Sequence, residues 1–163
     1  MSVKRILQWL ALAIAIVASL APIAHVLELA NKMRLEGPLW LGVQQHLYNG
    51  RGPFLGGPAE IGGLAFSVAL VLVYWPEARL RRRYIVAAFA YAGMLAAFFI
   101  FNDPVNKAVR AWTAHTLPLT WPRYRLQWES GHVIACALGL IALFMNASAI
   151  LQPRRRASAG SDT

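Results

Sequence analysis

The amino-acid sequence predicts an all-α protein, an up-and-down bundle of four transmembrane helices with short interfacial helices capping its outer end. Hydrophobic residues make up 58% of the 163 positions and charged residues only 14%, whereas an ordinary soluble domain is about 25% charged. The mean hydropathy is +0.46. Four segments are long and apolar enough to cross a hydrocarbon core, which takes about 20 residues. These observations predict an integral membrane protein.

The four predicted spans belong to a single domain, 1–152. The spans cover about residues 6–30, 59–76, 84–102 and 129–151. Lys4-Arg5 followed by an apolar run is also typical of a secretory signal peptide, but this run of about 24 residues is longer than the usual apolar core of 7–15. We therefore expect a retained helix. The residues after the domain, 153–163, are predicted to form a basic, disordered cytoplasmic tail.

Two longer connections between the spans predict the cap. The segment LWLGVQQHLY (39–48) has apolar residues at helical spacing and lies between Gly37-Pro38 and a glycine-rich stretch, which indicates a short amphipathic helix. A second short helix is indicated after Pro104, in NDPVNKAVRAW. Aromatic rings favour the membrane interface, and this outer layer contains Trp40, Trp112, Trp121 and Trp128.

The positions of the basic residues predict the orientation, because short loops rich in Lys and Arg stay in the cytoplasm. Basic residues flank both termini and fill the tight connection between the second and third spans, at Lys4, Arg5, Arg79, Arg81, Arg82, Arg83, Arg154, Arg155 and Arg156. We expect a multi-pass protein of the inner (plasma) membrane with both termini cytoplasmic. The net charge of +9 is explained by this topology and by the lipid bilayer as partner, and nothing indicates nucleic-acid binding.

Polar residues gather at the outer ends of the spans. The first and fourth spans each carry a stripe on one helical face. The stripes consist of His25, Glu28 and Lys32 on the first span and Arg125, Glu129, His132 and Cys136 on the fourth. Because the two spans run in opposite directions, each stripe has its Glu nearer the outer surface and its His about one turn deeper, so the stripes can match. Glu60 begins the second span at the same boundary, and Asn102 and Asn106 end the third.

Ionisable side chains inside a bilayer cost about 2.5–3.5 kcal/mol each, so they usually face inward and mark a functional site. We therefore expect the two stripes to line a polar pocket at the outer end of the bundle. The alternative is that these groups only hydrogen-bond between helices and hold the bundle together. His46 and His115 lie in the cap and are expected to be interfacial residues rather than ligands. The single cysteine, Cys136, is expected to be a small buried apolar residue.

Three chemistries remain open for this pocket. The Glu-x-x-His spacings are similar to those of di-iron sites in helical bundles, and the metal ligands would be His25, Glu28, Glu60, Glu129 and His132. Two histidines at one level on antiparallel helices can instead ligate a haem iron axially. Without a cofactor, an imidazole with a carboxylate can act as a general base. The cofactor is therefore iron or copper, haem, or none.

Three strings of the sequence resemble the anthrone oxygenase-like family of small four-span membrane proteins, most of whose bacterial members are uncharacterised. These strings are AHVLELANKMRLEGPLWLGVQQHLYNG, FNDPVNKAVRAWT and LPLTWPRYRLQWESGH. The resemblance covers nearly all of the chain through the fourth span. It implies a four-helix membrane bundle, and it implies chemistry like that of the fungal members, which oxidise an anthrone methylene to a quinone carbonyl with dioxygen.

The resemblance and the stripes together lead us to expect an oxygenase-like enzyme that acts on a lipophilic, aromatic or quinone-like small molecule. The expected catalytic residues are His25, Glu28, Asn102, Asn106, Arg125 and His132, with the two asparagines and the arginine positioning an oxyanion or carbonyl. The expected substrate-binding residues are Trp112, Trp121 and Trp128. The chain has no nucleotide fingerprint for NAD or a flavin. The competing class is a non-enzymatic membrane module, either a ligand- or haem-binding subunit or an accessory protein of a larger complex.

Overall fold

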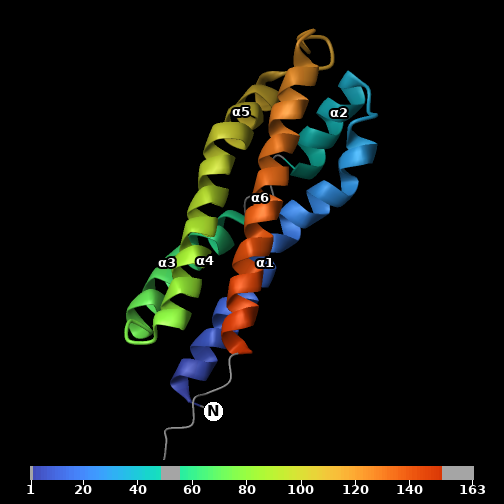
Figure 1. The fold of residues 1–163 in the computed structure, drawn as a ribbon. Helices are drawn as coiled ribbons and strands as arrows, with labels where there is room; N and C mark the ends of the chain where they lie inside the picture. Colours follow the sequence, from blue (N-terminus) through green and yellow to red (C-terminus); the bar gives the residue numbers. More distant parts are fainter. Residues whose placement is uncertain (1, 49–55, 152–163) are drawn as a thin grey trace, which may run out of the picture.

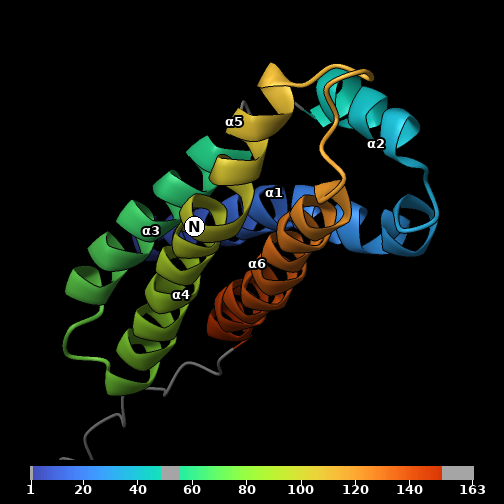
Figure 2. The same cartoon turned by 90° about the horizontal axis from the view of Figure 1, so that it is seen from above.

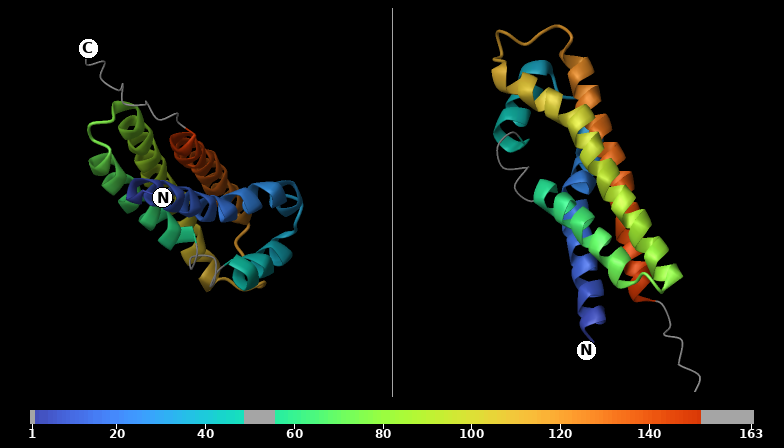
Figure 3. Two further views of the ribbon diagram at one scale, coloured as in Figure 1. Left: turned by 90° about the horizontal axis from the view of Figure 1, so that it is seen from below. Right: turned by 90° about the vertical axis from the view of Figure 1, so that its left-hand side faces the viewer.

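The computed structural model describes residues 2–48 and 56–151, and this part of the chain is helical, with no strand (Figure 1). Four helical segments are long and apolar enough to cross a membrane, which fits a membrane-embedded protein. They are α1 (Val3–Lys32), α3 (Gly56–Val73), the continuous segment Ala78–Ala111 and α6 (Trp121–Ile150). The segments run alternately up and down (Figure 3). The predicted four-helix bundle is confirmed, and the predicted tail, 153–163, lies outside the described residues.

The third span is longer than predicted, because it continues without interruption into the cap. It consists of α4 (Ala78–Ala97), the π-helical turn η3 (Phe98–Asn102) and α5 (Asp103–Ala111). Pro104 has no N–H to donate to the carbonyl four residues earlier, at Ile100. In the π-helical turn the N–H of Asp103 donates to Phe98 O, and the Ile100 carbonyl accepts a hydrogen bond from Gln127 Nε2 at 3.4 Å. The cap helix after Pro104 is therefore an extension of the third span.

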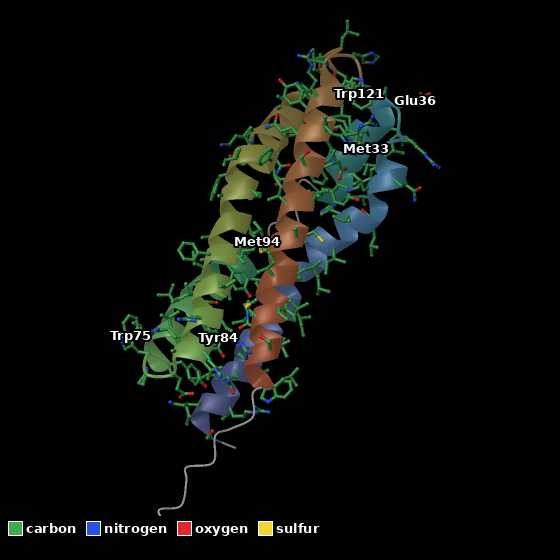
Figure 4. All side chains as sticks on the ribbon, in the orientation of Figure 1. Met33, Glu36, Trp75, Tyr84, Met94 and Trp121 are labelled. Carbon is green, nitrogen blue, oxygen red and sulfur yellow. The ribbon has the colours of Figure 1, made fainter. Side chains whose placement is uncertain are left out.

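Small residues form the centre of the bundle. The largest core cluster contains Ala15 and Ala18 of α1, Ala87 and Ala90 of α4, and Ala135 and Ala142 of α6. Small side chains let membrane helices approach closely, which favours van der Waals packing where lipid supplies little hydrophobic drive. Met94 fills the middle of this core (Figure 4). Many of the large apolar side chains point outward instead; Phe89, for example, is 74% exposed.

Helix α3 is the shortest span and does not reach the cap. Its 18 residues extend about 27 Å, against about 45 Å for the 30 residues of α6. The right-hand view of Figure 3 shows α3 beginning well below the cap. Gly63 of α3 lies directly against the ring of Tyr91, in the middle part of α4, where a Cβ would collide with the ring. Glu60, about one turn earlier on α3, therefore lies below the cap.

The cap has a small core of its own at the end of the bundle where α1 ends and α6 begins. It contains α2 (Gly37–Val43), the π-helical turn η1 (Gln44–Tyr48) and α5, which Figure 2 shows next to one another. The buried residues of its core are Trp40, Leu41, Val105, Val109 and Trp128. Gln45 Nε2 donates to the carbonyls of Val109 and Trp112, each at 2.8 Å. We call this the cap end.

The opposite end contains the start of α1, the α3–α4 turn and the last turn of α6, and we call it the basic end. Cationic and amide side chains there bind the last carbonyls of α6. Arg5 Nη1 donates to Ile150 O at 2.8 Å, Gln8 Nε2 donates to Ala149 O at 3.2 Å, and Arg83 Nη1 donates to Ser148 O. These contacts satisfy carbonyls that have no partner within the helix, and the arginines favourably oppose the negative end of its dipole.

Candidate functional site

The two polar stripes lie side by side at the cap end and meet at the Lys32 ammonium. Lys32 Nζ lies 3.0 Å from Glu129 Oε2, 3.1 Å from His25 Nδ1 and 4.0 Å from Glu28 Oε2. Lys32 is 4% exposed and Glu129 is 2% exposed. We call His25, Glu28, Lys32, Glu129 and His132 the polar cluster. Two antiparallel helices thus place a buried ion pair and two histidines in one site.

The two imidazoles of the polar cluster touch each other. The ring centroids of His25 and His132 are 3.9 Å apart, and the ring planes are inclined by 32°. An ammonium group can only donate, so His25 Nδ1 accepts from Lys32 and the proton of a neutral ring lies on Nε2. The indole of Trp128 meets both imidazoles edge-on, with centroid distances of 4.9 Å to His25 and 4.2 Å to His132.

Tyr48, at the end of η1, forms the cap side of the cluster. Its hydroxyl donates to Glu28 Oε2 at 2.6 Å, and its ring meets His25 edge-on at 4.7 Å between centroids. Burial, the hydrogen bond to Glu28 and the negative charge of that carboxylate together raise the pKa of Tyr48 well above its usual value. The Lys32 ammonium lies 5.5 Å from the Tyr48 ring centroid and 5.1 Å from that of Trp128, within cation–π range.

Tyr48 and Lys32 are the two members of the site to which the sequence had assigned no role. Lys32 lies on the predicted stripe of the first span, so helical periodicity was enough to place it on the polar face. Its position at the centre of the cluster depends on how α1 and α6 pack, which the sequence does not give. A tyrosine at the end of an amphipathic, aromatic-rich segment is an ordinary interfacial residue, and no sequence pattern distinguished Tyr48 from the others.

The two asparagines support Trp128 rather than reaching the histidines. Asn102 Nδ2 donates to Trp128 O at 2.8 Å, and Trp128 Nε1 donates to Asn106 Oδ1 at 2.9 Å. Asn102 is buried against the backbone of Gly131, where a Cβ would collide with its side-chain amide. These contacts fix the orientation of the indole that borders both imidazoles.

Arg125 holds the end of α1. Its Nη1 donates to Leu35 O at 2.8 Å and to Lys32 O at 3.3 Å, and its guanidinium carbon lies 4.6 Å from the Trp121 ring centroid. The predicted role of Arg125 in positioning a substrate oxyanion stays a prediction. In the structure Arg125 positions the backbone that carries Lys32.

Several residues singled out in the sequence lie away from the polar cluster. Trp112 packs edge-on against Tyr124, with centroids 4.9 Å apart, and Trp121 packs on Trp40 at 5.7 Å, so both contribute to the core of the cap. Glu60 forms no ion pair or hydrogen bond with any residue in the part of the chain that the structure describes. The remaining ones are His46 and His115, which are exposed, and Cys136, which is buried.

The arrangement of the polar cluster fits neither a metal site nor an axially ligated haem. Over residues 2–48 and 56–151, no group of three or more His, Cys, Asp or Glu side chains is arranged to hold a metal ion. The Lys32 ammonium already lies between the carboxylates and His25, and Glu60 lies deeper on α3, so the predicted five ligands do not converge. The touching His rings leave no space between them for a porphyrin. The donor set as arranged offers acid–base chemistry.

A buried oxygen atom of the cluster lacks a partner. Glu129 Oε2 pairs with Lys32, whereas Glu129 Oε1 is buried and accepts no hydrogen bond from any described residue. A buried carboxylate oxygen without a donor is costly and uncommon. It marks the position where a donor group from a bound molecule would be stabilised.

Comparisons with protein-family models, with curated proteins and with solved structures found no match. The resemblance to the anthrone oxygenase-like family therefore stays a prediction.

Proposed function

We propose that this protein is an oxygenase-like membrane enzyme that acts on a lipophilic aromatic or quinone-like molecule at the polar cluster. The observation that carries the proposal is the contact between His25 and His132 beside the buried Lys32–Glu129 pair. Ionisable groups inside an apolar bundle cost free energy, because they lose their contact with water, and such groups normally serve a function. Two imidazoles, an ammonium and a carboxylate with one unpaired oxygen supply proton acceptors and a positive charge in one place.

The acid–base roles follow from the hydrogen bonds. His25 is tied to Lys32 through Nδ1, while no described residue forms a hydrogen bond with His132. His132 is therefore the better base for removing an acidic proton from a methylene group next to an aromatic carbonyl. Lys32, whose ammonium lies 3.1 Å from His25 Nδ1 and 3.0 Å from Glu129 Oε2, stabilises the negative charge that develops on the enolate. A phenolic hydroxyl of the substrate would donate to Glu129 Oε1.

The overall reaction takes a methylene to a carbonyl with dioxygen as the oxidant. One CH₂ group and one O₂ give one C=O group and one H₂O, so the two hydrogens leave as water and four electrons pass from the carbon to oxygen. The protein's own residues take the first proton and return it to the departing water. The aromatic rings of Tyr48 and Trp128 border the site and suit a flat aromatic substrate.

A direct test uses anthrone as the substrate and compares paired histidine variants. Protein in mild detergent should consume oxygen and form the quinone, followed with an oxygen electrode and by absorbance, faster than the spontaneous oxidation of anthrone in buffer. His132→Gln and His25→Gln should each lower the rate by about 100-fold, the usual contribution of a general base. His46→Gln and His115→Gln, at exposed positions, are the matched controls and should keep the full rate.

Two results would count against the proposal. If a panel of anthrones and hydroquinones shows no oxygen uptake above the spontaneous rate, the enzyme class is wrong and the non-enzymatic membrane module takes its place. If the activity is present but the four histidine variants behave alike, the reaction does not use the His25–His132 pair.

A further inference from the structure

An apolar groove runs along the outside of the bundle between α3 and α4, far from the polar cluster. It encloses about 320 Å³, and its walls are entirely apolar. The main lining residues are Leu64, Val68 and Val71 of α3 and Ile85, Phe89 and Ala92 of α4. Phe89 is 74% exposed and Val68 49% exposed, so the groove opens outward, toward the hydrocarbon in a membrane.

The groove ends at arginines and a tryptophan on the basic end. On α4, Arg81 and Arg82 precede Ile85 by one helical turn, and so they lie on the groove-lining face of the helix. In the α3–α4 turn, just after the end of α3, Trp75 follows Val71 by four residues and lies beside the other wall. Figure 4 shows Trp75 at the outer edge of the α3–α4 turn. The guanidinium of Arg81 lies 4.8 Å from the centroid of the Trp75 ring, and Arg81 Nη1 donates to Trp75 O.

Arg82 remains available to a ligand. It is exposed, and no described residue forms an ion pair or hydrogen bond with it. It lies beside the N-terminus of α4, whose cap residue, Glu77, makes no side-chain capping bond. Free N–H groups and the positive end of the helix dipole therefore reinforce the charge of Arg82.

We propose that this groove is a binding site for one anionic phospholipid, with an acyl chain along the groove and the phosphate at Arg82. The dimensions fit. From Arg82 to Ala92 the helix rises about 15 Å, which is half of a hydrocarbon core about 30 Å thick. The groove thus extends from a headgroup level to the middle of the bilayer. The Trp75 ring stands at the interface, where amphipathic rings are favoured.

Charge complementarity selects the anionic lipid. A zwitterionic headgroup brings an ammonium to a site that already contains Arg81 and Arg82, whereas phosphatidylglycerol brings a net negative charge. Basic residues near a membrane surface attract anionic lipid by about a factor of five each. The apolar walls explain why a lipid, and not a free phosphate ion, is the ligand.

The test counts lipids bound to the intact chain by native mass spectrometry, with phosphatidylglycerol and phosphatidylcholine titrated separately. Wild-type protein should bind phosphatidylglycerol about five times more tightly or better. Arg82→Gln should remove that preference by lowering the affinity for phosphatidylglycerol about fivefold. Ala88→Phe fills the groove wall without changing the charge, and it should weaken the binding of both lipids.

Arg79→Gln is the matched control, because it removes the same charge about one turn earlier on α4. At about 100° per residue, Arg79 lies about 130° around the helix from the middle of the groove-lining face, against about 70° for Arg82. It should leave the preference for phosphatidylglycerol within twofold of wild type. Equal affinities of the wild type for the two lipids would overturn the proposal. So would an Arg79→Gln variant that loses as much affinity as Arg82→Gln, because the attraction would then be that of a diffuse positive surface.

Discussion

The two ends of this bundle differ in where their charged side chains lie, at the surface at one end and buried at the other. At the basic end the cations stay at the surface: Lys4 pairs with Glu77 at 3.1 Å with the two side chains 54% and 48% exposed, and Arg5 binds the end of α6. At the cap end Lys32 and Glu129 pair at 3.0 Å with side chains 5% and 3% exposed. Helix capping and a surface ion pair account for the contacts of Arg5 and Lys4.

The buried arrangement at the cap end needs a further explanation. Taking a lysine and a glutamate out of water costs several kcal/mol per ion, and apolar residues of similar size often give a more stable protein. Stability alone would therefore favour replacing this pair with leucine or methionine. The comparison teaches that a charge next to a helix end is ordinary, whereas a charge inside the bundle, beside two touching imidazoles, points to a function.

The largest expected effect comes from removing one partner of the buried pair. Lys32→Met leaves the Glu129 carboxylate buried and unpaired, and it should lower the free energy of unfolding by about 3–5 kcal/mol. Lys4→Met breaks the exposed pair with Glu77 and should cost less than about 1 kcal/mol. Unfolding in mixed micelles with increasing SDS, followed by circular dichroism, measures both.

A double variant sharpens this result. Lys32→Met with Glu129→Leu removes both charges and should recover most of the stability lost by Lys32→Met alone. The proposed oxygen-consuming activity should be absent from both variants. Equal small losses for Lys32→Met and Lys4→Met would show that the two ends do not differ as described.

The next effect concerns the close packing that supports Trp128. Gly131→Ala places a methyl group against the Asn102 amide, so the hydrogen bond to Trp128 O must break, and we expect a loss of about 2–3 kcal/mol. Gly62→Ala is the control, since a Cβ there meets no atom within 4 Å and alanine favours a helix. Thermal unfolding in detergent should show a lower Tm for the first variant and an unchanged or higher Tm for the second.

A smaller effect is expected from the capping contacts at the basic end. Arg5→Gln removes the charge that binds Ile150 O and opposes the dipole of α6, which should cost about 1 kcal/mol. The proposed oxygen-consuming activity should not change, because the basic end lies far from the polar cluster. An Arg5→Gln variant that keeps its stability but loses activity would mean that the basic end takes part in the reaction.

The smallest expected effect is a dependence of folding stability on pH that arises from Tyr48. The folded protein raises the pKa of this phenol above its unfolded value of about 10, so its contribution to stability is fully present below pH 10 and is lost as the pH rises further. Between pH 9 and 11 the wild type should therefore lose stability more steeply than Tyr48→Phe. Parallel curves for the two proteins would mean that Tyr48 titrates alike in both states.

The spans and the two stripes could be predicted from the sequence because hydrophobic length and helical periodicity depend on neighbouring residues alone. The contact of His25 with His132 needed only the further assumption that α1 and α6 are adjacent. The level of Glu60 along the bundle could not be predicted, because the length of the second span does not fix how far along its neighbours that span lies. This level depends on the packing of Gly63 against Tyr91. Tyr48 was missed because its approach to Glu28 depends on how the cap folds back.

The continuity of the third span has a mechanical consequence. Since η3 carries the helix past Pro104 without a break, α5 is the end of one continuous helix and is not joined to the bundle by a loop. We therefore do not expect this side of the cap to move as a separate lid. A substrate of the proposed enzyme would then have to enter sideways between helices, from the hydrocarbon. Its arrival rate would follow its partitioning into the bilayer, so that diluting the membrane with more lipid would slow turnover even at constant total amounts of enzyme and substrate.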